Sequence, residues 1–104
     1  MSAYLDIRGA SGALYRYTRI ENAAPPTAHS GICLYVREAE GEAPEILYVA
    51  EAENLMTGGA ARWQEAVSKH GATGLFTRLH VAGSTRKAEL EDVLAVLTPV
   101  MTPA

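Results

Sequence analysis

Two short apolar segments constrain the fold of this chain more than any other feature. Residues 31–36 (GICLYV) and 45–50 (EILYVA) are rich in β-branched and aromatic side chains, and a polar loop that contains three glutamates separates them. Segments of this length and composition, joined by a loop with glycine and proline, predict two antiparallel strands. We therefore expect the fold to be organised around a β-hairpin at residues 31–50.

The segments on either side of this hairpin predict further strands and helices. Residues 60–70 have the helical apolar spacing Trp63, Ala66, Val67 and His70, with Gly71 in place for a left-handed cap. Other patterns predict an N-terminal hairpin at 4–20, a short helix at 51–56 and a third core strand at 75–81. A last helix is predicted to begin near Ser84 and to end near Pro99. Its apolar stripe consists of Leu90, Val93, Leu94 and Leu97. We expect an α+β fold with a small central antiparallel three-stranded sheet flanked by helices, and an additional N-terminal β-hairpin.

The length of 104 residues is typical of a single domain. Within it we expect residues 1–22 to form a hairpin packed on the core and residues 23–30, which include two consecutive prolines, to form a connector. Residues 31–99 are predicted to form the core, and residues 100–104 a tail. The apolar content of 48% is enough to fill one such core without a metal or a disulfide.

The composition argues against several classes of protein. Cys33 is the only cysteine, so no disulfide can form within the chain. No apolar stretch reaches the roughly 18 residues that span a membrane, and no basic-then-apolar leader is present, so we expect a cytoplasmic protein without membrane contact. The formal net charge of −3, with Arg86-Lys87 as the only adjacent basic pair, argues against tight binding to duplex nucleic acid.

The order of the predicted elements and several short motifs resemble the GIY-YIG nuclease domain over about residues 31–99. Gly31-Ile32-Cys33 stands where that family has Gly-Ile-Tyr, and Tyr48-Val49-Ala50 stands where it has Tyr-Ile-Gly. Asn54-Leu55 resembles the Asn-Leu that often follows the second motif. The closing helix of the family is matched by Arg86, Glu89, Asp92, Val93, Leu94 and Pro99.

The resemblance implies phosphodiester cleavage by tyrosines of the two motifs, an arginine, and a glutamate that holds a divalent metal. In this sequence the positions of the first tyrosine, the arginine and the glutamate fall on Cys33, Gly58 and Leu90, and only Tyr48 is retained. A leucine cannot ligate Mg²⁺, and a glycine offers no guanidinium to a phosphate. The resemblance therefore implies a degenerate, catalytically inactive domain that acts as a binding or interaction module.

The alternative is an endonuclease with an altered active site, which would use Tyr48, Arg62 and either Glu89 or Glu91 with Mg²⁺ or Mn²⁺. The structural interpretation of the same residues is a tyrosine ring packed in the core, a solvated arginine and two solvated glutamates on different faces of a helix. If the chain is not such an endonuclease, we expect no cofactor. We also expect no metal site, because His29, His70 and Cys33 are widely scattered.

Arg78, Arg86 and Lys87 are the candidates for contact with nucleic acid, because with His80 they gather on the third strand and the start of the last helix. The plainer interpretation of Arg86 and Lys87 is surface charge at a helix start. We thus consider three hypotheses: a module that binds a protein partner or, weakly, nucleic acid; a metal-dependent nuclease; and a homodimer formed through edge strands.

Overall fold

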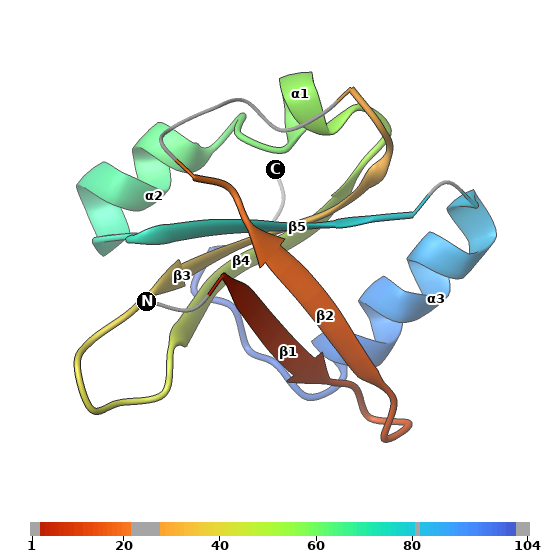
Figure 1. Ribbon diagram of the computed structural model, residues 1–104, viewed down its shortest axis with the longest axis horizontal. Helices are drawn as coiled ribbons and strands as arrows, with labels where there is room; N and C mark the ends of the chain where they lie inside the picture. Colours follow the sequence, from red (N-terminus) through yellow and green to blue (C-terminus); the bar gives the residue numbers. More distant parts are fainter. Residues whose placement is uncertain (1–2, 22–27, 81, 102–104) are drawn as a thin grey trace.

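The computed structural model describes residues 3–21, 28–80 and 82–101, so the predicted connector and tail lie partly outside the described residues. Within these residues, five strands and three helices follow one another (Figure 1): β1 (Tyr4–Arg8), β2 (Leu14–Arg19), β3 (Gly31–Arg37), β4 (Glu45–Ala52), α1 (Leu55–Gly58), α2 (Trp63–His70), β5 (Gly74–Leu79) and α3 (Gly83–Leu94). Among the described residues, no helix has the length and apolar character needed to cross a bilayer.

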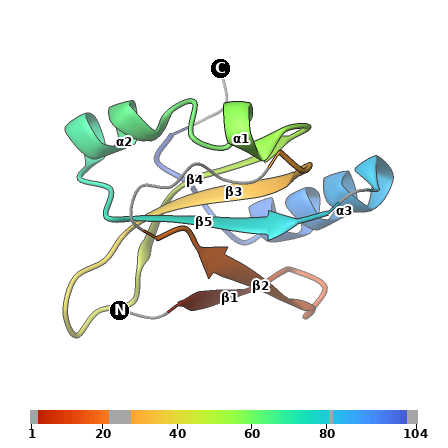
Figure 2. The same cartoon turned by 45° about the horizontal axis from the view of Figure 1, so that its top comes forward.

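All five strands belong to one antiparallel sheet, in the order β1-β2-β5-β3-β4. The α+β class is as predicted, but the prediction of a three-stranded sheet with a separate hairpin is wrong. The N-terminal hairpin joins the sheet because β2 pairs with β5 at Thr18–Thr77 and Arg19–Phe76. Beyond these pairs β2 turns away from β5, and the sheet curls (Figure 2).

Helices cover both faces of the sheet. In Figure 1, α1 and α2 lie on one side of β5 and α3 lies on the other. Side chains of β3 alternate between these two sides: Cys33 and Tyr35 face α1 and α2, whereas Ile32, Leu34 and Val36 face α3. The central strand is therefore buried on both faces, and it separates two apolar cores.

A β-bulge changes the direction of side chains on β4. Tyr35 is opposite Tyr48, but the next residue, Val36, is opposite Ile46, so Leu47 is an extra residue on β4. As a result Leu47 and Tyr48 both pack into the core beneath α1 and α2. The carbonyl of Leu47 accepts a hydrogen bond of 2.8 Å from the N–H of Met101, which is itself buried.

The two helices on the first face differ in how well their bounds were predicted. α2 ends at His70 as expected, and Gly71 adopts the left-handed conformation (φ 70°) that the sequence predicted for its cap. α1 is shorter than the predicted segment, because residues 51 and 52 extend β4. It begins after Asn54, whose side-chain oxygen accepts a hydrogen bond from the N–H of Met56.

The last helix packs most of its predicted apolar stripe and also buries two charged residues. α3 begins at Gly83 rather than after a Ser84 cap. Val93 is buried in the core, and Leu90 and Leu97 pack against the same core, as predicted, whereas Leu94 is 39% exposed. Arg86 and Glu89 are buried as well, and apolar spacing did not predict their burial because both are charged.

Candidate functional site

Tyr48 and Arg62, two of the residues that the sequence singled out, are in contact. The guanidinium of Arg62 lies 5.3 Å from the centre of the Tyr48 ring, in a cation–π arrangement. The Tyr48 ring also packs against Tyr35 at 4.9 Å between ring centres, and Trp63 meets Tyr35 edge-on at 5.3 Å. Burial raises the pKa of Tyr48 even though Arg62 opposes the shift. Tyr48 is thus a neutral core tyrosine covered by an arginine.

Tyr35, which the sequence did not single out, makes the more specific hydrogen bonds in this cluster. Its hydroxyl donates to the carbonyl of Gly59 at 2.8 Å and accepts from the N–H of Arg62 at 3.3 Å. Burial raises its pKa. Tyr35 therefore fastens the central strand to the connection between α1 and α2.

The charge of Arg62 is matched within its own helix. Arg62 lies 2.8 Å from a carboxylate oxygen of Glu65, three residues further along the chain. The hydrogen bond from Arg62 lowers the pKa of Glu65. Arg62 is thus shared between an aromatic ring and a carboxylate rather than solvated as the plainer interpretation supposed.

On the opposite face of the sheet, Glu89 holds two basic side chains. Its Oε1 lies 2.7 Å from Nε of Arg78, and its Oε2 lies 2.7 Å from Nε2 of His80. The side chain of Glu89 is only 9% exposed. The interpretation of Glu89 as a solvated charge is therefore wrong, whereas Glu91 on the same helix is exposed.

The same network reaches the N-terminal hairpin. Arg78 lies 5.4 Å from the ring centre of Tyr15 and donates a 3.3 Å hydrogen bond to the carbonyl of Arg16. Tyr17 is almost fully buried, and this burial raises the pKa of its hydroxyl. The hydroxyl of Tyr17 also interacts electrostatically with Arg78 and Glu89. The cluster thus joins β2, β5 and α3 across the curled part of the sheet.

Arg86 and Lys87 meet a carboxylate from the end of β4. Nε of Arg86 lies 3.0 Å from Glu51 and Nζ of Lys87 lies 3.3 Å from the other carboxylate oxygen. Burial alone would raise the pKa of Glu51, but the hydrogen bonds from the two basic residues outweigh it and lower the pKa. Arg86 is buried, so its interpretation as simple surface charge is wrong, and Lys87 alone has a largely exposed side chain.

The structure therefore brings the candidates together in three groups and not in one. Tyr48 and Arg62 lie under α2, Arg78 and Glu89 lie under α3, and the central sheet separates these pairs. The basic candidates do gather near the start of α3, but each is paired with a carboxylate. In the described part of the chain, no group of three or more histidine, cysteine, aspartate or glutamate side chains is arranged to hold a metal ion.

Of the three positions at which the family motif is broken, Cys33 and Leu90 pack in the core and Gly58 is exposed. Cys33 is 1% exposed, as predicted, and burial raises the pKa of its thiol to about 11. Leu90 packs against the core beneath α3. Gly58 ends α1, where an added Cβ would come within 3.2 Å of the Ala52 side chain. Cys33 shares the core of Tyr35 and Tyr48, whereas Leu90 packs on the opposite face of the sheet.

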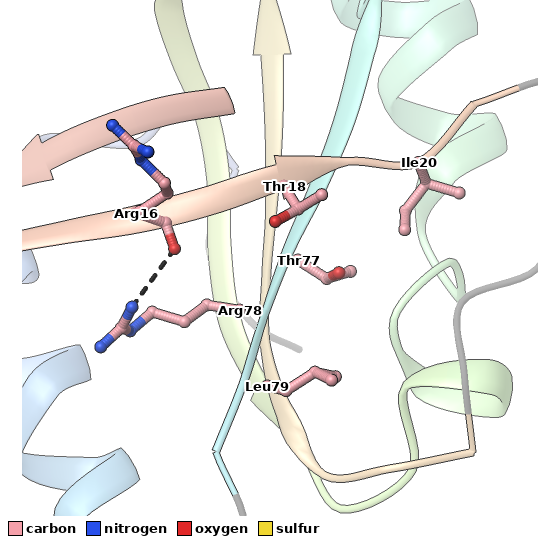
Figure 3. A pocket seen from close by; sticks show the side chains of 6 residues that line it. All are labelled: Arg16, Thr18, Ile20, Thr77, Arg78 and Leu79. Atoms are coloured by element: carbon pink, nitrogen blue, oxygen red, sulfur yellow. Dashed lines mark hydrogen bonds between the residues drawn. The ribbon is translucent and has the colours of Figure 1, made fainter. Parts of the chain in front are cut away.

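A groove of about 430 Å³ lies where β2 turns away from β5 (Figure 3). Thr18 and Thr77, which form one of the two pairs between these strands, line it together with Ile20 and the half-exposed Leu79. Figure 3 shows the Arg78 side chain spanning the gap between the strands to reach the carbonyl of Arg16. Where the ladder between β2 and β5 ends, Arg78 thus provides a donor for one backbone carbonyl of β2.

We compared the chain with known protein families, curated proteins and solved structures. No protein-family model, curated protein or solved structure matches it. The described residues form a small α+β protein with a curled five-stranded antiparallel sheet, a half-buried Arg62–Glu65 ion pair on one side of it and a more deeply buried Arg78–Glu89 ion pair on the other.

Proposed function

We propose that this chain is a degenerate GIY-YIG-like domain that acts by binding and does not cleave phosphodiester bonds. The observation that supports the proposal is the position of the central sheet between Tyr48 and Arg62 on one face and Glu89 on the other. An altered nuclease site would need to combine Tyr48 and Arg62 with Glu89 or with Glu91, and both glutamates lie on α3. Tyr48, Arg62 and Glu89 already have partners within the chain.

The chemistry explains why this separation matters. Metal-assisted phosphodiester cleavage requires a cation, a metal-binding carboxylate and a proton-transfer group around one phosphate. A phosphate that touched Arg62 would be kept from Glu89 by the buried strand β3. Release of Glu89 to a metal would also leave the half-buried Arg78 without its carboxylate.

A protein is the partner that the charge distribution favours over a nucleic acid. Arg78 is half-buried and Arg86 is buried. Each of them is paired with a glutamate, so neither presents a free guanidinium to a phosphate backbone. The formal net charge of −3 opposes binding to a polyanion as well. Protein surfaces have no such uniform requirement for cations.

Incubation of the pure protein with single-stranded, duplex and branched DNA, in Mg²⁺ or Mn²⁺, tests the proposal. We expect no cleavage by the wild-type chain. Tyr48→Phe and Glu89→Gln serve as matched variants, with circular dichroism to establish that each is folded. Cleavage that persists unchanged in both variants identifies a contaminating nuclease and agrees with the proposal. Cleavage by the wild type that is lost in either folded variant overturns it in favour of the altered active site.

A further inference from the structure

The strand β1 ends the sheet and directs part of its backbone outward. Hydrogen bonds from the N–H of Arg19 to Ala3 and from the N–H of Gly9 to Ala13 fix which residues of β1 face β2. Since hydrogen-bonded residues alternate along an antiparallel strand, Leu5 and Ile7 bond to β2. The N–H and C=O groups of Asp6 and Arg8 then point away from the sheet at its edge.

The other edge of the sheet is protected by its structure. On β4 the bulge at Leu47 interrupts the regular backbone, and the N–H of Met101 occupies the Leu47 carbonyl. In the described part of the chain, the backbone of Asp6 and Arg8 receives no comparable cover. The two edges therefore differ, and β1 is the edge able to accept a further strand.

We propose that β1 pairs with β1 of a second copy of this chain, antiparallel, with Asp6 of each copy opposite Arg8 of the other. The two-fold axis then passes between the two Ile7 residues. Each of the two Asp6–Arg8 pairs exchanges both backbone hydrogen bonds, and the carboxylate of one strand faces the guanidinium of the other on the exposed side of the sheet. The contact is isologous, as a closed dimer requires.

Charge selects this register over its neighbours. A slide of two residues in one direction places Asp6 opposite Asp6, and the same slide in the other direction places Arg8 opposite Arg8. Both arrangements oppose like charges and are destabilising. Arg8 is suited to the pairing because its guanidinium bonds within the chain to a neutral group, the carbonyl of Gly12, and has further donors.

The Asp6 carboxylate is also bound by Arg16 of its own chain. Arg16 donates hydrogen bonds to both oxygens of Asp6, at 2.9 and 3.1 Å, and its own side chain is 61% exposed. A carboxylate has two oxygens with several acceptor sites, so Asp6 can receive Arg16 of its own chain and Arg8 of the second copy together. Hydrogen bonding to Arg16 already lowers the pKa of Asp6, which keeps the carboxylate charged.

Charge reversal, followed by sedimentation velocity from about 10 μM to about 1 mM, tests the dimer, because weak interfaces assemble in this range. We expect the wild type to reach the mass of a dimer as concentration rises, and Arg8→Glu and Asp6→Arg each to remain monomeric. Mixing the two variants should restore the dimer, because the acidic strand of one then faces the basic strand of the other. The control Lys69→Glu, on α2 and far from β1, changes the charge by the same amount and should dimerise like the wild type.

Three results would overturn the inference: a wild type that stays monomeric throughout, dimerisation of Arg8→Glu equal to that of Lys69→Glu, or a mixture of folded variants that does not associate. Circular dichroism of each variant shows whether it is folded. If Asp6→Arg does not fold because it loses the ion pair with Arg16, the comparison of dimerisation between Arg8→Glu and Lys69→Glu still decides the question. The inference depends only on the edge of β1, so the nuclease assay and this experiment can fail independently.

Discussion

Glu89 and Glu91, two residues apart on α3, lie in opposite environments. Glu89 is buried between Arg78 and His80, whereas Glu91 is exposed. Replacement of Glu89 by glutamine keeps the shape of the side chain but leaves Arg78 without a counter-charge. We expect Glu89→Gln to lower the free energy of unfolding by about 2 kcal/mol, since the site is only partly solvated. Glu91→Gln should change it by less than about 0.5 kcal/mol. Urea denaturation measures both, and equal values would contradict the role assigned to Glu89.

The two core tyrosines Tyr35 and Tyr48 also differ at the level of single atoms. The hydroxyl of Tyr35 bonds the carbonyl of Gly59, which is buried, while the Tyr48 ring is held mainly by stacking. Tyr35→Phe leaves that carbonyl unsatisfied, so we expect a loss of about 1.5 kcal/mol in unfolding free energy. Tyr48→Phe retains the ring contacts and should cost less than half as much. A larger loss for Tyr48→Phe would show that its hydroxyl, rather than its ring, anchors the cluster.

At the scale of elements, Asp92 fastens the N-terminal hairpin to α3. Its carboxylate accepts hydrogen bonds from the N–H and hydroxyl of Ser11, at 2.8 and 2.7 Å, and from the hydroxyl of Tyr15 at 2.7 Å. Gly9 lies so close that an added Cβ would overlap the Asp92 carboxylate. One aspartate thus holds a turn between β1 and β2 against a helix at the other end of the chain.

These hydrogen bonds predict an acid dependence of stability. The bonds from Ser11 and then Tyr15 lower the pKa of Asp92 in the folded state. A depressed carboxylate pKa adds stability that is fully present above the unfolded value, about 3.9, and is lost as the pH falls toward the folded value. We expect the melting temperature of the wild type to fall more steeply below about pH 4 than that of Asp92→Asn. Other carboxylates contribute equally to both proteins, and parallel curves would contradict the assignment.

Sequence patterns predicted those elements whose signals are local. The end of α2 at Gly71 and the pairing of β3 with β4 follow from the residues of each segment. The pairing of β2 with β5 rests on two residue pairs that are distant in sequence, and no local pattern records it. On α3 the apolar spacing predicted the packing of Leu90, Val93 and Leu97 but not the burial of Arg86 and Glu89, whose charges are paired with residues on other strands.

At the scale of the whole molecule, the candidate site depends on which face of the sheet each residue occupies. The sequence grouped Tyr48 and Arg62 with Glu89 or Glu91 in one altered site, and of these residues Tyr48 and Arg62 are in contact. It gathered Arg78, Arg86 and Lys87 on the third strand and the start of the last helix, where Arg86 donates a hydrogen bond to the carbonyl of His80, just after β5. It could not place Glu89 across the sheet from Tyr48, because no local pattern records which face of the sheet the last helix covers. Tyr48 is opposite Tyr35 in the regular register of β3 and β4 and shares a face with Cys33 and Ala50, whereas α3 packs on the other face.

The single cysteine provides a probe of how the whole molecule opens. Cys33 lies in β3, between the two cores, is 1% exposed, and has a thiol pKa raised by burial to about 11. A thiol reagent attacks only the thiolate, so the native chain must open before it reacts. At pH 8 we expect labelling at least about 10³ times slower than in the unfolded chain. The rate should rise with urea with the slope of global unfolding, because β3 has strands on both sides.

A relocated cysteine separates global from local opening. In Cys33→Ser combined with Ser84→Cys, the thiol lies at an exposed position at the start of α3 and should react at the rate of an unfolded chain, with no dependence on urea. If Cys33 of the wild type also reacts independently of urea, the central strand opens without the rest of the sheet. That result would contradict a fold in which both cores depend on β3, since their shared strand would then be the first to separate rather than the last.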